Sequence, residues 1–377
     1  MAKIPLVDLK ANYRRHKEAI DAAMADVIET TSFIQGPALK AFEEAFAQFC
    51  GARHAIGVGS GTAAIHIVLD ALGVGPGDEV AVPSHTFIAT AEPVTWLGAT
   101  PRFVEIDPST GAMDPAALRS VLAADTGKRI KVVMPVHIHG RMVDMDAIAA
   151  VAAEAGIPVV EDAAQAHGAS YRRADGTEVR AGSYAIAGCF SFYPGKNLGA
   201  YGDAGAITTN DEAFAGKVRM LRDHGRISKY EHLIVGYAHR MDTLQAAVLH
   251  PKLSTLDSDN ARRRELAAGY TAALAGVGDL TFLADPAGRV SVYHHYVVLT
   301  PQRDALLKHL GANGVGAGVH YPIPLHLQPA YAGLGVARGE LPHTETFTER
   351  CLSLPIYPEL TDDQLARVVA EVKAFYP

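Results

Sequence analysis

Lys196 lies in a turn of unusual composition, Ser191-Phe192-Tyr193-Pro194-Gly195-Lys196-Asn197. Most lysines are solvated surface residues. A lysine held among aromatic rings loses water instead, so its pKa falls and its amine becomes a nucleophile toward carbonyl groups. We therefore treat Lys196 as a candidate catalytic residue, with an ordinary surface lysine as the alternative interpretation.

A glycine-rich turn, Gly59-Ser60-Gly61-Thr62, separates an expected strand at His54–Val58 from an expected helix at residues 63–72. Free N–H groups and the helix dipole make such a turn a natural phosphate site, and its two hydroxyl groups are further donors. The alternative is a turn in which Ser or Thr only caps the helix. A full dinucleotide-binding fingerprint is absent, because Ala64 occupies the position of the last glycine.

Asp162 follows the apolar run Ile157–Val160, which we expect to be a buried strand. An acid at the carboxyl end of such a strand lies where open α/β sheets bind ligands, and it suits a cationic ring. Gln165 is expected to reach the same crevice, and Phe87, beyond the expected strand Glu79–Pro83, is able to stack on a ring. The alternatives are a helix N-cap for Asp162 and core packing for Phe87.

Pyridoxal 5'-phosphate (PLP) is one cofactor that uses all of these features together. Its aldehyde condenses with a lysine amine, and an aspartate keeps its ring nitrogen protonated, so that the ring accepts electrons from the substrate. The glycine-rich turn would hold its phosphate. The chain order of turn, acid and lysine predicts one sheet that presents all three at its carboxyl edge.

The elements that must position these residues follow from the apolar pattern. Apolar runs at His54–Val58, Glu79–Pro83, Lys131–Val136 and Ile157–Val160 alternate with Ala-rich helical stretches, which predicts an α/β fold with a mostly parallel sheet flanked by helices. A helix is expected after Gly36-Pro37, and Thr361-Asp362-Asp363-Gln364 matches a capping box. Alternation in Tyr296–Leu299 predicts a smaller α+β unit. We place the boundary near Pro251, giving a large domain at 1–250 and a small domain at 251–377.

The composition excludes several classes of protein. Thirty-four Lys and Arg residues against 41 Asp and Glu give the 377-residue chain a net charge of −7, which offers no broad attraction to nucleic acid or anionic lipid. Three distant cysteines predict no disulfide framework, and no apolar stretch approaches the roughly 20 residues of a membrane span. We expect a soluble, cytoplasmic protein with no nucleic acid or membrane as partner.

Histidine, a common metal ligand, is abundant, with 17 residues. His137-x-His139 would project both rings from one face of a strand, and His294 and His295 are adjacent. Neither pair has a third and fourth ligand at metal spacing. We expect these histidines to be core or supporting residues, and we expect no metal.

In this order and spacing, the motifs resemble the DegT/DnrJ/EryC1/StrS family of sugar aminotransferases, within the fold-type I PLP enzymes. The resemblance covers nearly the whole chain. The matching segments are Gly59-Ser60-Gly61-Thr62-Ala63-Ala64, Thr86-Phe87-Ile88-Ala89-Thr90, Glu161-Asp162-Ala163-Ala164-Gln165-Ala166-His167-Gly168, Phe190-Ser191-Phe192-Tyr193-Pro194-Gly195-Lys196-Asn197 and His320-Tyr321-Pro322-Ile323-Pro324-Leu325-His326.

The resemblance implies a role for each candidate residue. Lys196 would be the Schiff-base lysine and proton shuttle, and Asp162 would pair with the pyridine nitrogen. The remaining cofactor contacts would be Gln165 near the ring hydroxyl, Phe87 stacked on the ring, and Ser60, Gly61, Thr62 and Ser191 at the phosphate. His320 and Tyr321 would lie near the sugar. The site would form between two subunits of a homodimer.

The implied activity is a ping-pong transfer of an amino group from L-glutamate to a nucleotide-linked keto sugar. The segment His320–His326 looks more like members that aminate C-3 than those that act at C-4. Amination at C-4, a keto-cyclitol substrate and a non-catalytic regulator that binds PLP or sugar remain alternatives. A family branch with histidine in place of the lysine performs deoxygenation, and the presence of Lys196 disfavours it.

Two departures from the family pattern concern the phosphate contact. Family members usually carry an Asn in the segment that here reads Gly236-Tyr237-Ala238-His239-Arg240-Met241. That Asn reaches the cofactor phosphate of the neighbouring subunit. Ala238 has no side-chain donor, and whether His239 replaces the Asn is open. The glycine pair usual after the lysine loop is Ala204-Gly205 here.

Overall fold

A central sheet of seven strands carries the fold. The computed structural model describes residues 3–376; residues 1, 2 and 377 of the predicted domain ranges lie outside the described part. In spatial order the strands are β3 (Thr100–Val104), β2 (Glu79–Pro83), β4 (Ile130–Val133), β5 (Val160–Asp162), β8 (Ala187–Ser191), β9 (Gly205–Thr209) and β1 (His54–Val58).

The sheet is parallel except for one strand. Isolated parallel bridges, Val133 with Val159 and Val136 with Asp162, join β4 to β5. Only β9 runs antiparallel, paired with β8 on one side and β1 on the other. Every residue of β2 and β9 is buried, as expected for strands covered on both faces. The predicted α/β fold with a mostly parallel sheet is confirmed.

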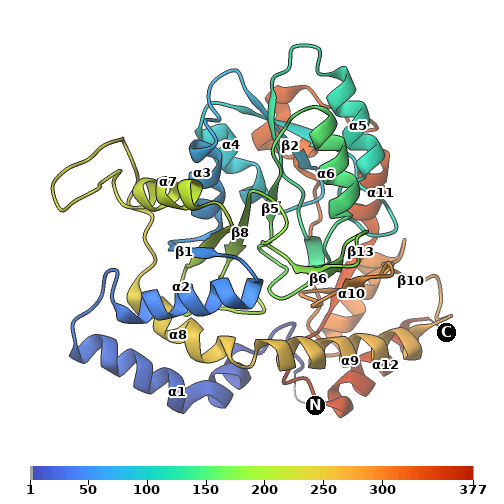
Figure 1. Cartoon of the computed structure of the whole chain (residues 1–377). Coiled ribbons are helices and arrows are strands. Elements are labelled where there is room, and N and C mark those ends of the chain that lie inside the picture. The colour runs from blue at the N-terminus through green and yellow to red at the C-terminus, as the bar shows by residue number, and fades with distance from the viewer. Residues whose placement is uncertain (1–2, 377) are drawn as a thin grey trace.

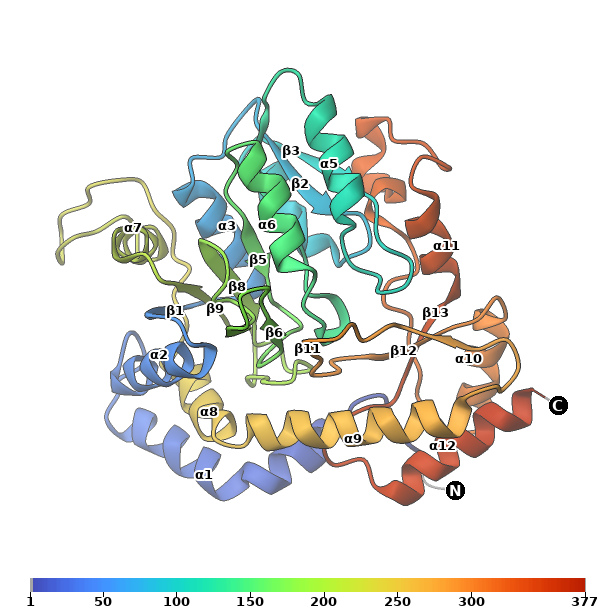
Figure 2. The same ribbon diagram turned by 45° about the vertical axis from the view of Figure 1, so that its right-hand side comes forward.

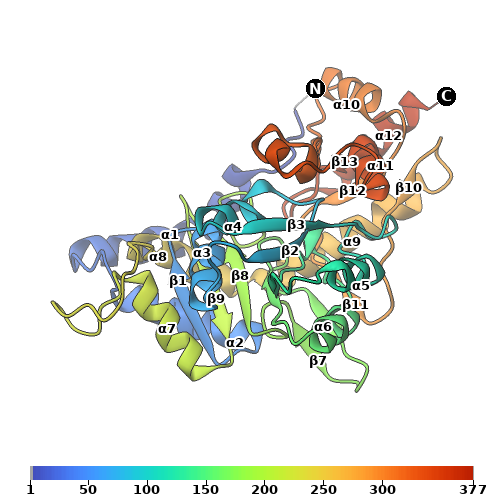
Figure 3. The ribbon, with the colours of Figure 1, turned by 90° about the horizontal axis from the view of Figure 1, so that it is seen from above.

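Helices cover both faces of this sheet (Figures 1 and 3). One layer comprises α3 (Gly61–Ala71), α4 (Glu92–Trp96) and α7 (Glu212–Arg222), and the other comprises α2 (Pro37–Cys50), α5 (Pro115–Ala124), α6 (Met145–Glu154) and α8 (Thr243–Leu253). Successive side chains along a strand point to opposite faces of the sheet and pack against different helix layers. In β1, Ile56 and Val58 join the core under α3, whereas Ala55 joins the core under α2.

The C-terminal part builds a second core around a small antiparallel sheet. The sheet contains β10 (Thr281–Phe282), β12 (Tyr296–Leu299) and β13 (Cys351–Leu354), and the helices are α9 (Leu256–Leu274), α10 (Arg303–Ala312), α11 (Pro342–Arg350) and α12 (Asp362–Phe375). Figure 2 shows α9 as one long helix from α8 to this region. Ile4 pairs with Val315 and belongs to this core. The domain boundary near Pro251, which lies inside α8, stays a prediction.

Shorter elements complete the structure. They are α1 (Leu9–Glu29), which packs on α8, the small sheet of β11 (Arg289–Val290), β6 (Ser170–Arg172) and β7 (Glu178–Arg180), and the 3-10 turns η1 (Ile88–Thr90), η2 (Ile138–Gly140), η3 (Leu325–Leu327) and η4 (Pro329–Leu334). Within residues 3–376, no helix is both long and apolar enough to cross a bilayer.

Several predicted elements are confirmed, and two are displaced. Strands β1, β2 and β12 have the predicted bounds, and Thr361 caps α12 in a capping box. The strand expected at 131–136 ends at Val133, and the one expected at 157–160 begins at Val160. Pro135 and Pro158 account for both shifts, because proline has no N–H for the ladder.

Candidate active site

One cavity of about 560 Å³ opens at the carboxyl edge of the parallel strands. It brings together every residue that the sequence put forward, although these come from distant parts of the chain. The predicted residues that line it are Ser60, Gly61, Thr62, Phe87, Asp162, Gln165, Ser191, Lys196, His320 and Tyr321.

Lys196 lies in the loop that follows β8. The loop turns tightly, since the Lys196 N–H donates to the Tyr193 carbonyl at 2.8 Å and the Ala200 N–H donates to the Phe192 carbonyl at 2.8 Å. Loss of water lowers the pKa of the Lys196 amine to about 8, and the nearby Asp162 charge opposes this shift. The unprotonated fraction of the amine near neutral pH is therefore much larger than that of an ordinary lysine, while the protonated form still predominates.

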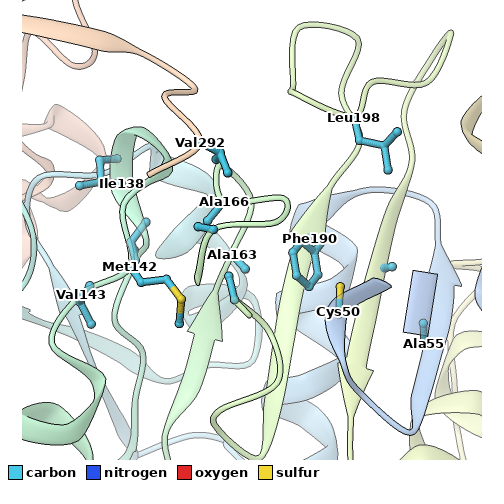
Figure 4. Close-up of a cluster of buried hydrophobic side chains, with 14 of the residues drawn as sticks. Cys50, Ala55, Ile138, Met142, Val143, Ala163, Ala166, Phe190, Leu198 and Val292 are labelled. Atoms are coloured by element: carbon cyan, nitrogen blue, oxygen red, sulfur yellow. The ribbon is translucent and has the colours of Figure 1, made fainter. Parts of the chain in front are cut away.

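Apolar packing holds the two loops that present the acid and the lysine. Figure 4 shows Ala163 and Ala166, on either side of Gln165, in the same buried cluster as Leu198 and Val292. Leu198 follows Lys196 by two residues and is almost fully buried. Both loops thus rest on one core rather than on solvent, which fixes the relative positions of their functional side chains.

Asp162 ends β5 and is buried. Its Oδ2 accepts a hydrogen bond from the Thr90 hydroxyl at 2.8 Å, and its Oδ1 accepts from the Ala164 N–H at 3.1 Å. Burial raises the pKa of Asp162, whereas these hydrogen bonds and the charge of Lys196 lower it. A cationic ring nitrogen beside this carboxylate would further favour its ionised form.

The N-terminus of α3 faces the cavity with free backbone donors. Ser60 caps the helix, since its Oγ accepts from the Ala63 N–H at 3.0 Å and its carbonyl accepts from the Ala64 N–H at 3.0 Å. The Gly61 and Thr62 N–H groups, in the first turn, have no intrahelical acceptor. A Cβ on Gly61 would lie 2.7 Å from the Ser191 Cβ, so only glycine lets these two segments meet.

These features fit PLP on three independent counts. The α3 N-terminus suits its phosphate, the buried carboxylate suits its ring nitrogen, and the Lys196 amine suits its aldehyde. The Phe87 side chain is 53% exposed, although phenylalanine is usually buried, and so offers a free ring face. Its ring centroid lies 5.5 Å from that of Tyr321.

Gln165 is oriented by two contacts. Its Oε1 accepts from the His139 N–H at 2.7 Å, and its Nε2 donates to the Tyr321 hydroxyl at 3.2 Å. The second contact joins the large sheet to the loop of residues 320–321. Gln165 thus links the floor of the cavity to the residues expected near a substrate.

The comparisons with known proteins agree with this geometry. The model of the DegT/DnrJ/EryC1/StrS aminotransferase family matches residues 14–373. The chain belongs to this family. A transaminase from Streptomyces venezuelae, named for dTDP-3-amino-3,4,6-trideoxy-alpha-D-glucose, is 44% identical over 98% of this chain and 96% of its own.

Two further proteins are similar to this chain over nearly its whole length. The crystal structure of Streptomyces venezuelae DesV in complex with a ketimine intermediate superposes with a TM-score of 0.95 and 43% identity, covering 100% of this chain and 99% of that one. A relative from Geobacillus stearothermophilus, called a pleiotropic regulatory protein, is 44% identical over 99% of this chain and 98% of its own.

The two departures from the family pattern have local explanations in this aminotransferase. The His239 ring stacks on Tyr237, and its Nε2 lies 3.4 Å from the His66 Nδ1. Within the single chain His239 therefore contacts its own α3 helix. A Cβ on Gly205 would lie 2.4 Å from the Ser60 carbonyl oxygen, so glycine is required at 205, whereas Ala204 is accommodated in the core.

Sequence reasoning missed some contributors and misplaced one pair. Thr86 and Thr90 line the cavity, and their spacing of four residues across η1 was the available signal. The rings of His137 and His139 do not share one strand face. His137 bonds to Glu161 at 2.9 Å, whereas His139 lies in η2 with a φ of 60° and contacts His85 and His295. Among residues 3–376 no group of three or more candidate ligands is arranged to hold a metal.

Proposed function

We propose that this protein is a PLP-dependent aminotransferase that moves the amino group of L-glutamate to C-3 of a nucleotide-linked keto sugar. The observation that carries the proposal is the meeting of Lys196 and Asp162 in one cavity with the N-terminus of α3. Membership of a family of aminotransferases supports the reaction class. The S. venezuelae relative, whose name specifies a 3-amino sugar, supports the position.

PLP, when bound, supplies an electron-accepting ring that stabilises negative charge on the reacting carbon of the substrate. The neutral fraction of the Lys196 amine is suited to attack the aldehyde. With PLP bound, the Nζ of Lys196 would be placed to take a proton from the donor carbon and deliver it to the neighbouring cofactor carbon, and to move a proton in the opposite sense in the second half reaction. The lowered pKa of Lys196, about 8, suits both tasks near neutral pH.

The other residues bind and orient. Asp162, held by Thr90, would face the ring nitrogen, and Phe87 would cover one ring face. Gln165 would lie at the ring hydroxyl. The phosphate would be held by the first-turn N–H groups of α3 and by hydroxyls, which belong to Ser60, Thr62 and Ser191. His320 and Tyr321 border the same cavity and would contact the sugar.

Reduction with borohydride tests the reaction class directly. The purified holoprotein should be yellow, and borohydride should bleach it and leave a pyridoxyl group on the peptide that contains Lys196, as read by mass spectrometry. Lys196→Ala should abolish both the colour and transamination. Transamination retained by this variant would refute the assignment.

The position of amination is tested by a panel of ketones. Nucleotide-linked 3-keto and 4-keto sugars and a keto-cyclitol should be supplied separately with L-glutamate, and release of 2-oxoglutarate should be measured. Turnover of the 3-keto sugar alone supports the proposal. Turnover of only the 4-keto sugar, or of only the cyclitol, would contradict amination at C-3 and assign the enzyme to that substrate instead. No turnover of any ketone by protein that contains PLP would favour a non-catalytic regulator.

A homodimer with shared sites is also proposed. The segment between α7 and α8 extends away from the molecule (Figure 1), and Ile227, Tyr230, Leu233 and Val235 along it are 55%, 82%, 64% and 92% exposed. Apolar side chains gathered in this way are typical of an interface. Sedimentation should give twice the chain mass of 40.0 kDa, and a stable monomer would contradict the proposal.

The three cysteines are free and buried, which suits the reducing cytoplasm.

A further inference from the structure

Two adjacent histidines, His294 and His295, line the cavity beside Lys196 with no role in the proposed chemistry. They precede β12, and their ring centroids are 4.1 Å apart. Both rings make their protein hydrogen bonds through Nδ1, to Asn197 and to His139. In the described part of the chain, the Nε2 atom of neither ring has a hydrogen-bond partner.

The tautomer of His294 is determined by two backbone carbonyls. The Asn260 amide donates to the His167 carbonyl at 2.8 Å, so its Oδ1 is an acceptor. The Asn197 amide nitrogen donates to that Oδ1 at 3.0 Å and to the Val292 carbonyl at 2.9 Å.

This fixes the orientation of the Asn197 amide. Its Oδ1, which only accepts, lies 3.1 Å from the His294 Nδ1. His294 therefore carries its proton on Nδ1 and presents a lone pair at Nε2.

The tautomer of His295 follows from a chain of three buried rings. His85 Nε2 lies 3.4 Å from His139 Nε2, and His139 Nδ1 lies 3.3 Å from His295 Nδ1. Each neutral ring carries one proton, so the two hydrogen bonds among these rings run in one of two directions. Either His85 donates to His139 and His139 donates to His295, or both bonds run in reverse.

The Nδ1 atom of His85, at one end of this row of three rings, decides between the two directions. The His85 Nδ1 is buried without a partner. The reverse direction would place an N–H there, and buried N–H groups without acceptors are rare. The forward direction leaves only a lone pair at this atom. His295 therefore receives a hydrogen bond at Nδ1 and carries its proton on Nε2.

The surroundings of these four rings keep them neutral. Burial lowers the pKa of His85 to about 3 and lowers the pKa of His139, His294 and His295 well below the usual value. The charge of Lys196 lowers the pKa of His294 and His295 further. His320 stacks on His295, with centroids 3.8 Å apart and an interplanar angle of 10°, and fixes the ring plane.

We propose that His294 and His295 together bind one hydroxyl group of the sugar, which accepts from the His295 Nε2–H and donates to the His294 Nε2. A hydroxyl group matches this pair, because it both donates and accepts, whereas a keto oxygen only accepts and an ammonium group only donates. The pair then determines specificity for a hydroxyl next to the reacting carbon. The identity of the ligand rests on the proposed function, whereas the two tautomers do not.

Neutron diffraction from crystals of the holoenzyme tests the tautomers without reference to activity. Deuterium should occupy Nδ1 of His294 and Nε2 of His295. Deuterium on Nδ1 of His295, or on Nε2 of His294, would overturn the proposal even if the enzyme proves to be a sugar aminotransferase.

Kinetics with deoxy analogues test the ligand. The wild type should lose about tenfold or more in kcat/KM on a keto sugar that lacks the hydroxyl at C-2 or at C-4, since a site built for a hydroxyl rejects an analogue without it. His295→Leu should raise the KM for the parent sugar and no longer discriminate against that analogue. Its glutamate half reaction should remain detectable, which shows that the aminotransferase chemistry survives and separates this outcome from failure of the proposed function.

Two further variants keep the test decisive. His139→Phe, which removes the neighbour that orients His295, should weaken the same discrimination by raising KM rather than lowering kcat, and it serves if His295→Leu does not fold. His250→Leu, at an exposed histidine of α8, is the matched control and should behave as the wild type. Discrimination retained in both His295→Leu and His139→Phe would overturn the proposal.

Discussion

The hydroxyl of Thr90 donates a 2.8 Å hydrogen bond to Oδ2 of Asp162, and the Thr86 hydroxyl lies 2.8 Å from that of Thr90. Because the Thr90 proton points to the carboxylate, Thr86 is the donor in the second bond. Burial raises the pKa of Asp162, and the hydrogen bond from Thr90 opposes the shift. The 3-10 turn η1 therefore supports the charge on which the proposed ring contact depends.

Thr90→Val should impair the enzyme by weakening that charge. Hydrogen bonds to charged groups contribute about 1.5–3 kcal/mol, so kcat/KM should fall about tenfold to a hundredfold. The pKa of Asp162 should rise further, which moves the acid limb of the pH–rate profile to higher pH. Thr126→Val, at an exposed threonine, is the control, and an acid limb that stays in place would contradict the role given to Thr90.

In the cofactor-free protein, the stability of Asp162→Asn minus that of the wild type should increase as pH rises. Burial raises the pKa of Asp162 above its ordinary value of 3.8, so the folded protein retains a proton that the unfolded chain has released. The stability contributed by this group therefore falls as pH rises from about 3.8 through the folded pKa. Melting temperatures of both proteins between pH 4 and 7 check this, and a constant difference would refute it. The variant should also lose transamination.

The local sequence pattern was sufficient to predict β1 and β2, because a short apolar run bounded by polar or glycine residues adopts few structures other than a buried strand. The same pattern did not reveal that β9 is antiparallel, since strand direction depends on the connection and leaves no trace in Gly205–Thr209 itself. The turns at Ser60 and Lys196 were predictable from residue type. The Thr90–Asp162 bond joins residues 72 positions apart, so only the folded topology reveals it.

The histidines of the cavity also show what sequence spacing does not predict. Adjacent residues such as His294 and His295 suggest a metal site by proximity in sequence, but what each ring presents to the cavity depends on Asn197 and His139. Those partners come from separate loops of the large sheet. Sequence spacing carries no information on hydrogen-bond direction. That direction depends on the Val292 and His167 carbonyls for His294 and on the partnerless Nδ1 of His85 for His295.

Reaction of the cofactor-free protein with PLP should accelerate as pH rises through about 8. Burial lowers the pKa of the Lys196 amine to about 8, and only the neutral amine attacks an aldehyde. Stopped-flow absorbance measures the rate. Binding of pyridoxamine phosphate, which has the same phosphate and ring but no aldehyde, is the control and should lack this dependence. A midpoint near the ordinary lysine value of 10.5 would refute the desolvation argument.

Glu161→Ala should destabilise the protein strongly. The Glu161 carboxylate is buried, contacts His137 at 2.9 Å and accepts hydrogen bonds at 2.9 Å from the N–H groups of Gly182, Tyr184 and Ala185. Its removal leaves these donors without an acceptor and should cost about 3–5 kcal/mol of unfolding free energy. Glu154→Ala removes an exposed partner of Arg119 and should leave the urea midpoint unchanged. Similar midpoints for both variants would contradict the prediction.

Gly205→Ala should weaken cofactor binding through the backbone of the phosphate site. The new Cβ would lie 2.4 Å from both the carbonyl carbon and the carbonyl oxygen of Ser60, so the chain must shift where it enters α3. Overpacking of this kind costs about 1–3 kcal/mol, and the displaced N–H groups of Gly61 and Thr62 should raise the Kd for PLP.

Gly216→Ala is the matched control for this substitution. Gly216 lies inside α7, and nothing lies within 4 Å of its ideal Cβ. Alanine is the better helix former by about 1 kcal/mol, so this variant should be slightly more stable and should bind PLP as the wild type does. Equilibrium dialysis and urea unfolding separate the two effects. Unchanged PLP affinity in Gly205→Ala would mean that the α3 N-terminus does not hold the phosphate, because the same shift cannot move those donors and leave their ligand in place.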